Sequence, residues 1–243
     1  MHKAKRAVIM AAGRGSRLDP LTRTVPKPLL PVRGSTFLER AIAVLHERGI
    51  EEIHIVVGYL AMAFAPIAAR DRRVHLIENP YHGSCNNISS LYVARAHLED
   101  AVILDGDQWI ANPMILAPQF EHSCYCCTKP QRETREWLLT APHGRVVSCS
   151  RTGGVPGVAD WQLWSVSFWT AKDGQKLRRF VEEDFAKEAN RDLYWDDIAL
   201  FLHPDAFSLG IRPVKEGDLM EIDTCAELAA FDPAYQTAAG EQR

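Results

Sequence analysis

Residues near the N-terminus have the types and spacing to bind a chain of phosphates. Gly13 and Gly15 follow a short apolar run, and Arg14 and Arg17 are interleaved with them. Glycines let backbone N–H groups approach an anion closely, and guanidinium groups add positive charge. Lys27 follows between two prolines, which stiffen the backbone that carries it. The pattern predicts a polyphosphate-binding loop; the alternative is a tight strand-to-loop turn with solvated arginines.

Two aspartates are candidates to bind a divalent cation. Asp107 comes soon after an apolar run at residues 101–104, where it would face the predicted phosphate loop. Mg²⁺ prefers carboxylate oxygens and is often bound by carboxylates together with substrate phosphates. Asp223 precedes a predicted helix at residues 224–231. It therefore fits a helix N-cap as well as a metal ligand, and taken alone the pattern favours the cap.

Strands and helices alternate over the first 107 residues. The predicted strands are at residues 7–12, 53–57, 74–77 and 101–104. The predicted helices between them are at 36–49, 60–69 and 88–98, the last of which Asn87 can cap. Most of these strands are apolar on both faces, which is typical of a parallel sheet covered by helices on both sides. Ligands of such sheets bind beyond the carboxyl ends of the strands. The turn at Gly13, the loop at 58–59 and the turn at 105–107 should therefore share one edge.

The second half of the chain is richer in β structure. The predicted elements are β segments at 137–140, 145–148 and 161–169, helices at 172–187 and 195–202, a strand at 212–215 and the helix at 224–231. There is no internal repeat and no low-complexity linker. We therefore expect one mixed α/β domain with a β-rich portion in its second half.

Composition excludes some classes of partner. The net charge of −3 provides no basic field for nucleic acid. No apolar run is long enough to cross a bilayer, so we expect no membrane insertion. The apolar run at 8–10 is too short for a signal peptide, which predicts a cytoplasmic location. The sequence gives no prediction of the oligomeric state.

Three of the six cysteines lie close together, at Cys124, Cys126 and Cys127. No second pair and no histidine cluster sits at the spacing of a zinc site. On a strand, Cys124 and Cys126 would face one side and Cys127 the other. We expect buried thiols that act as small hydrophobic groups.

Several segments together resemble a known family. MAAGRGSRL at 10–18 followed by PKPLLPV at 26–32 resembles the signature of nucleotidyltransferases that activate sugar phosphates and related alcohols. Further segments resemble the choline-phosphate cytidylyltransferases of bacteria: NPY at 79–81, NNISSL at 86–91, LDGD at 104–107, EW at 136–137, SVSFW at 165–169, DLYWD at 192–196 and EID at 221–223. Phosphonate-activating relatives share these motifs. The resemblance spans about residues 7–231.

The resemblance implies a fold and a division of the chain. The fold is a Rossmann-like nucleotidyltransferase fold of the α/β class, with a mixed, mostly parallel central sheet flanked by helices. The single domain, residues 1–243, would contain a nucleotide-binding half at about 1–122 and a β-rich acceptor-binding half at about 123–235. The tail at 236–243 is predicted to be flexible.

The resemblance also implies Mg²⁺-dependent transfer of CMP from CTP to phosphocholine. An anionic acceptor oxygen would attack the α-phosphorus in line, so no general base is needed. The site residues carried over are Gly13, Gly15 and Arg17 for the triphosphate, Ala11 and Ala12 for the base, Asn86, Asn87 and Ser90 near the cytosine or ribose, Lys27 with Arg17 as the catalytic cations, and Asp107 and Asp223 as metal ligands. Asp105 is expected beside the metal ligands rather than among them.

Aromatic and acidic residues should select the acceptor. The candidates are Glu136, Trp137, Tyr194, Trp195, Asp196 and Asp197. A quaternary ammonium is bound by aromatic faces, which predicts a cage of Trp137 and Trp195 with Asp196 or Asp197. Trp164 and Phe168 are expected to fill core.

A different acceptor remains open on the same residues. A primary ammonium prefers carboxylates that accept hydrogen bonds, so the acidic pair at 196–197 with Glu136 keeps 2-aminoethylphosphonate as the alternative. A sugar-1-phosphate nucleotidyltransferase and a silent nucleotide-binding module rank below both.

Overall fold

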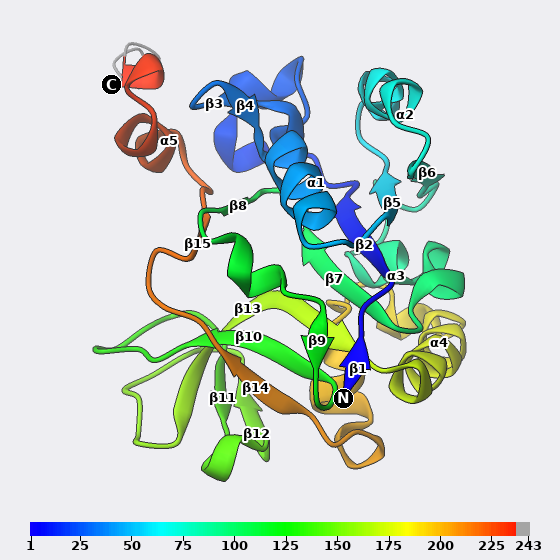
Figure 1. Cartoon of the computed structure of the whole chain (residues 1–243), viewed down its shortest axis with the longest axis vertical. Helices are drawn as coiled ribbons and strands as arrows, with labels where there is room; N and C mark the ends of the chain where they lie inside the picture. The colour runs from blue at the N-terminus through cyan, green and yellow to red at the C-terminus, as the bar shows by residue number, and fades with distance from the viewer. Residues whose placement is uncertain (237–243) are drawn as a thin grey trace.

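A nine-stranded mixed sheet forms the centre of the molecule in the computed structural model, which describes residues 1–236 (Figure 1). Its strands are β2 (Arg6–Ala11), β5 (Glu52–Val57), β6 (Val74–Glu78), β7 (Ala101–Asp105), β10 (Cys124–Thr128), β11 (Leu138–Thr140), β12 (Ser148–Ser150), β13 (Asp160–Trp169) and β14 (Gly210–Pro213). They lie in the order β12-β11-β13-β7-β2-β5-β6, and β10 pairs with β13 and β14. β7, β2, β5 and β6 are parallel, whereas β13 runs antiparallel to both β7 and β10. The predicted mixed, mostly parallel sheet is confirmed.

Helices cover both faces of this sheet. α1 (Phe37–Glu47) and α2 (Ala65–Arg70) pack on one face, and α3 (Ile88–Val93) and α4 (Ala171–Phe185) pack on the other. α5 (Cys225–Phe231) lies away from the sheet, in a smaller hydrophobic cluster with Phe37. Three short strand pairs lie outside the sheet: β1 (His2–Lys3) with β9 (Gln119–Phe120), β3 (Pro31–Val32) with β4 (Ser35–Thr36), and β8 (Gln108–Ile110) with β15 (Leu219–Glu221). In Figure 1, α1 lies on one side of β2 and β7, and α3 and α4 lie beyond them.

Side-chain alternation along the strands builds two hydrophobic cores. On β2, Ile9 belongs to the core that contains most of the buried residues of α1, and Val8 belongs to the core that contains the buried apolar residues of α3 and α4. Successive side chains of a strand point to opposite faces, so a strand that is apolar throughout is buried on both. α1 begins with a capping box, in which Thr36 and Glu39 each accept a hydrogen bond from the other's backbone N–H.

The carboxyl ends of the parallel strands meet at one edge, as predicted. The backbone N–H of Gly106, just after β7, donates to Met10 O at 2.8 Å. The N–H of Tyr59, just after β5, donates to Ala12 O at 3.0 Å. These contacts bring the loops after β2, β5 and β7 together.

Some predicted elements have different bounds. The predicted helix at 88–98 ends as α3 at Val93 and is followed by a 3₁₀ turn, Arg95–His97. Asn87 is the N-cap residue of α3 as predicted, but its side chain makes no capping hydrogen bond, because its Oδ1 accepts from the backbone N–H of Trp195 at 2.8 Å. The predicted helix at 195–202 is only a π-helical turn, Ile198–Leu202, and the β segment at 145–148 lies further along, as β12.

The cysteine cluster lies on β10, a strand that pairs with both β13 and β14. Cys124 and Cys126 face one hydrophobic core and Cys127 the other, as expected for a strand. All three thiols are buried, and burial raises the pKa of Cys124 to about 11, so that it stays protonated near neutral pH. The other three cysteines are half-buried.

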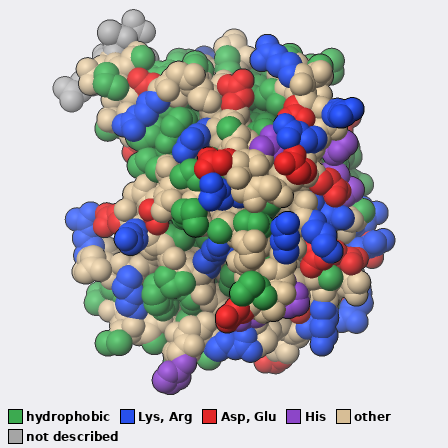
Figure 2. Space-filling model, viewed as in Figure 1, with side chains coloured by type: hydrophobic (Ala, Val, Ile, Leu, Met, Phe, Trp, Pro, Cys, Tyr) green, Lys and Arg blue, Asp and Glu red, His purple; other side chains and the backbone are tan. Residues whose placement is uncertain are grey.

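The two predicted halves share the sheet, because β13 of the second half pairs with β7 of the first. The described residues include no helix that is long and apolar enough to cross a membrane. Basic and acidic side chains are interspersed on the face shown in Figure 2. Most of the predicted tail, residues 237–243, lies outside the described residues.

Trp195 lies in the core, which corrects its predicted place in an acceptor cage. Its side chain is completely buried and packs against Tyr125, with ring centroids 6.1 Å apart, and against Trp169 at 6.4 Å. Large aromatic residues bury much apolar area and often occupy cores of this kind. The aromatic density of the second half therefore reflects packing at this position.

We expect Trp195→Ala to lower the free energy of unfolding by about 3 kcal/mol or more, because a large buried ring is replaced by a cavity. Trp161→Ala is the control, since Trp161 is a half-buried tryptophan of β13, and its loss should be clearly smaller. Urea denaturation at equilibrium measures both. Wild-type stability in Trp195→Ala, combined with weaker acceptor binding, would return Trp195 to the acceptor site.

Candidate active site

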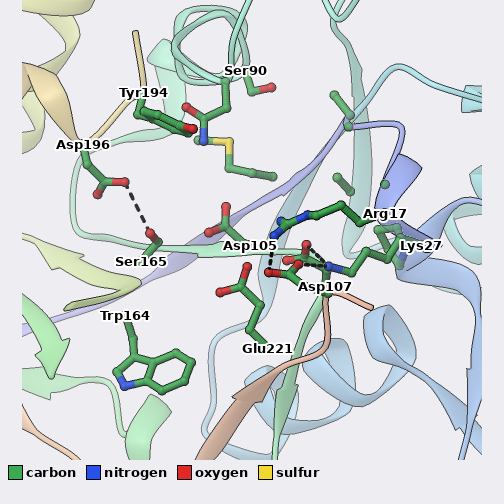
Figure 3. A pocket seen from close by; sticks show the side chains of 18 of the residues that line it. Arg17, Lys27, Ser90, Asp105, Asp107, Trp164, Ser165, Tyr194, Asp196 and Glu221 are labelled. Atoms are coloured by element: carbon green, nitrogen blue, oxygen red, sulfur yellow. Dashed lines mark hydrogen bonds and ion pairs between the residues drawn. The ribbon is translucent and has the colours of Figure 1, made fainter. Parts of the chain in front are cut away.

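A cavity of about 410 Å³ opens at the carboxyl edge of the parallel strands (Figure 3). Its walls come from both halves of the chain. The residues that line it are Met10, Ala11, Ala12, Gly13, Gly15, Arg17, Lys27, Pro28, Asn87, Ser90, Asp105, Asp107, Glu136, Trp137, Leu163, Trp164, Ser165, Tyr194, Asp196, Glu221 and Asp223. Most of the site residues expected from the sequence are therefore brought together around one space.

Lys27 is a buried cation held between two carboxylates. Its side chain is only 6 % exposed, and its Nζ lies 2.7 Å from Asp107 Oδ2 and 2.8 Å from Asp223 Oδ1. Burial alone would lower the pKa of Lys27, but the two carboxylates outweigh that effect and raise it above its ordinary value. Lys27 is therefore a fixed positive charge at the cavity wall. Arg17 adds a second cation, 2.7 Å from Asp223 Oδ2.

The local sequence sets the position of Lys27. Lys27 begins a 3₁₀ turn, Lys27–Leu29, which Pro26 precedes and which contains Pro28. The first N–H groups of such a turn have no partner within it, so a proline, which lacks an N–H, is tolerated there. Gly15 has a left-handed backbone, with φ at 66°, and a Cβ at this position would lie 2.9 Å from Lys27 Cβ. Glycine therefore allows the loop after β2 to pack directly on the lysine.

Asp223 is not the N-cap of α5. The helix-cap role, which the local sequence pattern around Asp223 favoured over a metal ligand, is therefore wrong. The cap is Thr224, whose hydroxyl accepts from the N–H of Glu227 in a capping box. Because the neighbouring residue caps the helix, the carboxylate of Asp223 is free to pair with Lys27 and Arg17.

Three carboxylates form a cluster that fits a divalent cation. Oxygen atoms of Asp107, Glu221 and Asp223 lie within 4.8 Å of one another. Hard oxygen donors of this kind suit Mg²⁺. Glu221 was not among the ligands expected from the sequence. It ends β15, two residues before Asp223, and this short spacing is the sequence signal that could have indicated it. Desolvation in the cavity, and then the charges of Asp107 and Asp223, raise the pKa of Glu221 to about 7.

A fourth carboxylate, Asp105, lies next to this cluster. It ends β7 and lines the cavity. Burial, and then the neighbouring Asp107 and Glu221, raise its pKa well above the ordinary value. Figure 3 shows Asp105 and Glu221 between the cations Arg17 and Lys27 on one side and Asp196 and Tyr194 on the other.

The far wall of the cavity contains a buried acid. Asp196 is 4 % exposed, and its Oδ2 accepts a hydrogen bond from Ser165 Oγ at 3.3 Å. Its carboxylate also interacts with the hydroxyl of Tyr125, which is buried behind it. Burial raises the pKa of Asp196 to about 7. Because Asp196 lines the cavity and forms no ion pair among residues 1–236, it is suited to a cation that the cavity admits.

Aromatic side chains stand beside Asp196. Tyr194 is 49 % exposed and packs edge-on against Trp137, with ring centroids 5.7 Å apart. Trp164, which was expected to fill core, is half-buried and lines the cavity, with its Nε1 donating to Thr128 Oγ1. Phe168 is fully buried, as expected.

Two expected site residues point elsewhere. Asp197 is 1 % exposed, and its Oδ1 accepts from Arg151 while its Oδ2 accepts from the backbone N–H of Tyr194. It therefore positions Tyr194 and does not line the cavity. Asn86 donates from its Nδ2 to Asp192 O and also lies outside the lining residues, whereas Asn87 and Ser90 line the cavity.

Comparison with known proteins gives one consistent result. The MobA-like NTP transferase domain family matches residues 7–186. The chain is 36 % identical to a 2-aminoethylphosphonate cytidylyltransferase from Lancefieldella rimae, over 94 % of this chain and 92 % of the relative. It is 31 % identical to a choline-phosphate cytidylyltransferase from Streptococcus pneumoniae, over 79 % of this chain and 82 % of the relative.

A solved structure agrees with these relatives. The CTP:phosphocholine cytidylyltransferase from Streptococcus pneumoniae superposes with a TM-score of 0.86 at 27 % identity, and the match covers 95 % of this chain and 99 % of that one. The resemblance drawn from the sequence motifs is confirmed. The chain belongs to the MobA-like NTP transferase family, and it is a nucleotidyltransferase of the cytidylyltransferase type.

Proposed function

We propose that this cytidylyltransferase transfers CMP from CTP to 2-aminoethylphosphonate. The sequence motifs favoured phosphocholine as the acceptor, with 2-aminoethylphosphonate as the alternative. Two observations reverse that order: the relative at 36 % identity that covers nearly the whole chain acts, by its name, on the phosphonate, and the cavity contains the buried acid Asp196. Phosphocholine is the second candidate, because aromatic rings also line the cavity.

The single observation that carries this proposal is the buried carboxylate of Asp196 in the cavity wall. A primary ammonium has three N–H donors and can give one to this carboxylate as well as neutralise its charge. A trimethylammonium group has no N–H donor, so it could neutralise the charge but could not donate a hydrogen bond to the carboxylate. Ser165, beside Asp196, adds a hydroxyl that can accept a second hydrogen bond from the ammonium.

The cations at the opposite wall suit the reaction at phosphorus. A phosphonate oxygen would attack the α-phosphorus of CTP in line; a P–O bond forms as the bond to the β-phosphate oxygen breaks, and pyrophosphate leaves. Both reactants are anions, so catalysis is mainly positioning and neutralisation of charge. Lys27 and Arg17 provide positive charge where the α-phosphate would lie, and no side chain has to remove a proton.

The carboxylates would hold the metal ion on which this chemistry depends. Asp107 and Asp223 are the expected ligands, and Glu221 joins them because its oxygen lies in the same cluster. A bound Mg²⁺ would supply Lewis-acid stabilisation of the charge on the triphosphate. Lys27 pairs with both Asp107 and Asp223, and this pairing directs their carboxylates toward the cavity.

The remaining lining residues would bind the nucleotide. Gly13 and Gly15 offer backbone N–H groups near Lys27 for the triphosphate. Ala11 and Ala12, at the end of β2, and Asn87 and Ser90, at the start of α3, face the same cavity and would contact the base and ribose.

The direct test is a substrate panel. Purified protein with Mg²⁺ and each nucleoside triphosphate is offered 2-aminoethylphosphonate, phosphocholine, phosphoethanolamine and sugar 1-phosphates, and pyrophosphate release is measured. We expect release with CTP, and the highest kcat/KM with 2-aminoethylphosphonate. A higher kcat/KM with phosphocholine would reverse the order of acceptors, and release only with sugar phosphates would reject both.

We expect the activity with 2-aminoethylphosphonate to depend on ionisation of Asp196. Its carboxylate binds the ammonium only when charged, and its pKa is raised to about 7, so kcat/KM should fall as the pH drops below 7. Asp196→Asn should lower kcat/KM by about thirtyfold or more, since losing one partner of a buried charge pair costs about 2 kcal/mol or more.

The phosphonate itself also titrates in this range, and the variant separates the two effects. Asp196→Asn should keep only the part of the pH profile that belongs to the substrate. Asp192→Asn, which changes an exposed aspartate nearby, is the matched control and should behave as wild type. Identical pH profiles for wild type and Asp196→Asn would remove Asp196 from the acceptor site.

A further inference from the structure

A cluster of histidines lies at the other end of the parallel strands. His54 on β5 is 5 % exposed, and its Nε2 lies 2.8 Å from Glu52 Oε1 on the same strand. His97, in the 3₁₀ turn after α3, places its Nδ1 3.9 Å from the same carboxylate oxygen. The rings of His54 and His97 are stacked, with centroids 3.5 Å apart. One ligand atom from each of the three residues lies within 4.8 Å of the other two.

This cluster is separate from the cavity. Glu52 is the first residue of β5, whereas the cavity lies beyond the last residue of the parallel strands. Five steps along a strand correspond to about 16 Å. None of the three residues lines the cavity or belongs to the carboxylate cluster at Asp107. A role in the proposed reaction does not account for them.

The donor set is that of a transition metal rather than Mg²⁺. Two imidazoles and one carboxylate are ordinary ligands of Zn²⁺, at about 2.0–2.1 Å. In tetrahedral geometry such bonds place neighbouring ligand atoms about 3.4 Å apart. The observed separations of 2.8 Å and 3.9 Å lie on either side of this value. Small movements of the side chains would therefore form the site.

The surroundings provide the freedom and the orientation that the site needs. The side chain of His97 is 31 % exposed, and no hydrogen bond holds its ring in the described part of the chain, so the ring can turn out of the stack to share a metal with His54. Arg6 on β2 lies 3.4 Å from Glu52 Oε2, which leaves Oε1 directed at the histidines. The partial exposure of His97 and Glu52 gives a path for the ion and room for water as a fourth ligand.

We propose that Glu52, His54 and His97 form a second metal site, specific for Zn²⁺ or a similar transition metal, which ties β5 to the turn after α3. Because the three residues lie on two segments, a bound ion cross-links the sheet to the helical layer beside it. The ion stabilises the folded protein, since it binds only where the fold brings the ligands together. This proposal is independent of the acceptor and of the site at Lys27.

Calorimetric titration of the full-length protein with Zn²⁺ tests the proposal. An excess of Mg²⁺ is present throughout to occupy the carboxylate cluster in the cavity. We expect one Zn²⁺ per chain and a higher melting temperature with Zn²⁺ than without it. His97→Gln and Glu52→Gln should each weaken Zn²⁺ binding by about tenfold or more, because loss of a ligand costs at least as much as loss of its supporting partner.

His75→Gln is the matched control. His75, on β6, stacks on His54 with centroids 5.3 Å apart but does not belong to the set of close ligand atoms, so this variant should bind Zn²⁺ as wild type does. Cytidylyl transfer with Mg²⁺ should be unchanged in His97→Gln, which shows that the variant is folded. Equal Zn²⁺ affinity in wild type and His97→Gln, or loss of binding in His75→Gln, would overturn the proposed ligand set.

Discussion

The structure depends on one buried ammonium group held between two carboxylates that are 116 residues apart in the sequence. Lys27 comes from the loop after β2, Asp107 follows β7, and Asp223 precedes α5. A buried charge is tolerated only when it is paired, so folding must bring the three segments that carry these residues together. The same pairing keeps the lysine charged and aims all three side chains at the cavity. The ion pairs of Lys27 thus do two things at once: they fix the positive charge of the cavity wall, and they hold the C-terminal segment at the edge of the sheet.

The opposite wall of the cavity contains a buried acid with no cationic partner among residues 1–236. Asp196 lies beside the hydroxyl groups of Ser165 and Tyr125, whereas its neighbour Asp197 is paired with Arg151. Asp197 also holds the backbone of Tyr194, and Asp196 is left to pair with a cation from the cavity. This difference between neighbouring carboxylates is the physical basis of the proposed preference for a primary over a quaternary ammonium.

The cationic half of the site could be predicted from sequence because its signals are local. A strand, a glycine turn and a lysine between prolines follow one another, and parallel strands bring their carboxyl ends to one edge. The acceptor half could not be predicted as well, because the direction of each side chain depends on distant packing. Trp195 points into the core against Tyr125, and Asp197 accepts a hydrogen bond from Arg151. The side chain of Asn87 accepts from the backbone N–H of Trp195 and makes no capping hydrogen bond to α3. Adjacent residues in the sequence gave no sign of which would face the cavity.

We infer that CMP transfer depends on the positive charge of Lys27, and the rate of single-turnover CMP transfer by Lys27→Met, with saturating CTP, acceptor and Mg²⁺, measures this dependence. We expect a rate lower by about a hundredfold or more, in line with the loss of one fixed electrostatic partner of the transition state. Lys172→Met, which removes an exposed lysine of α4, should keep the wild-type rate. Circular dichroism establishes that both variants are folded. A rate near that of wild type in folded Lys27→Met would show that transfer does not need this charge.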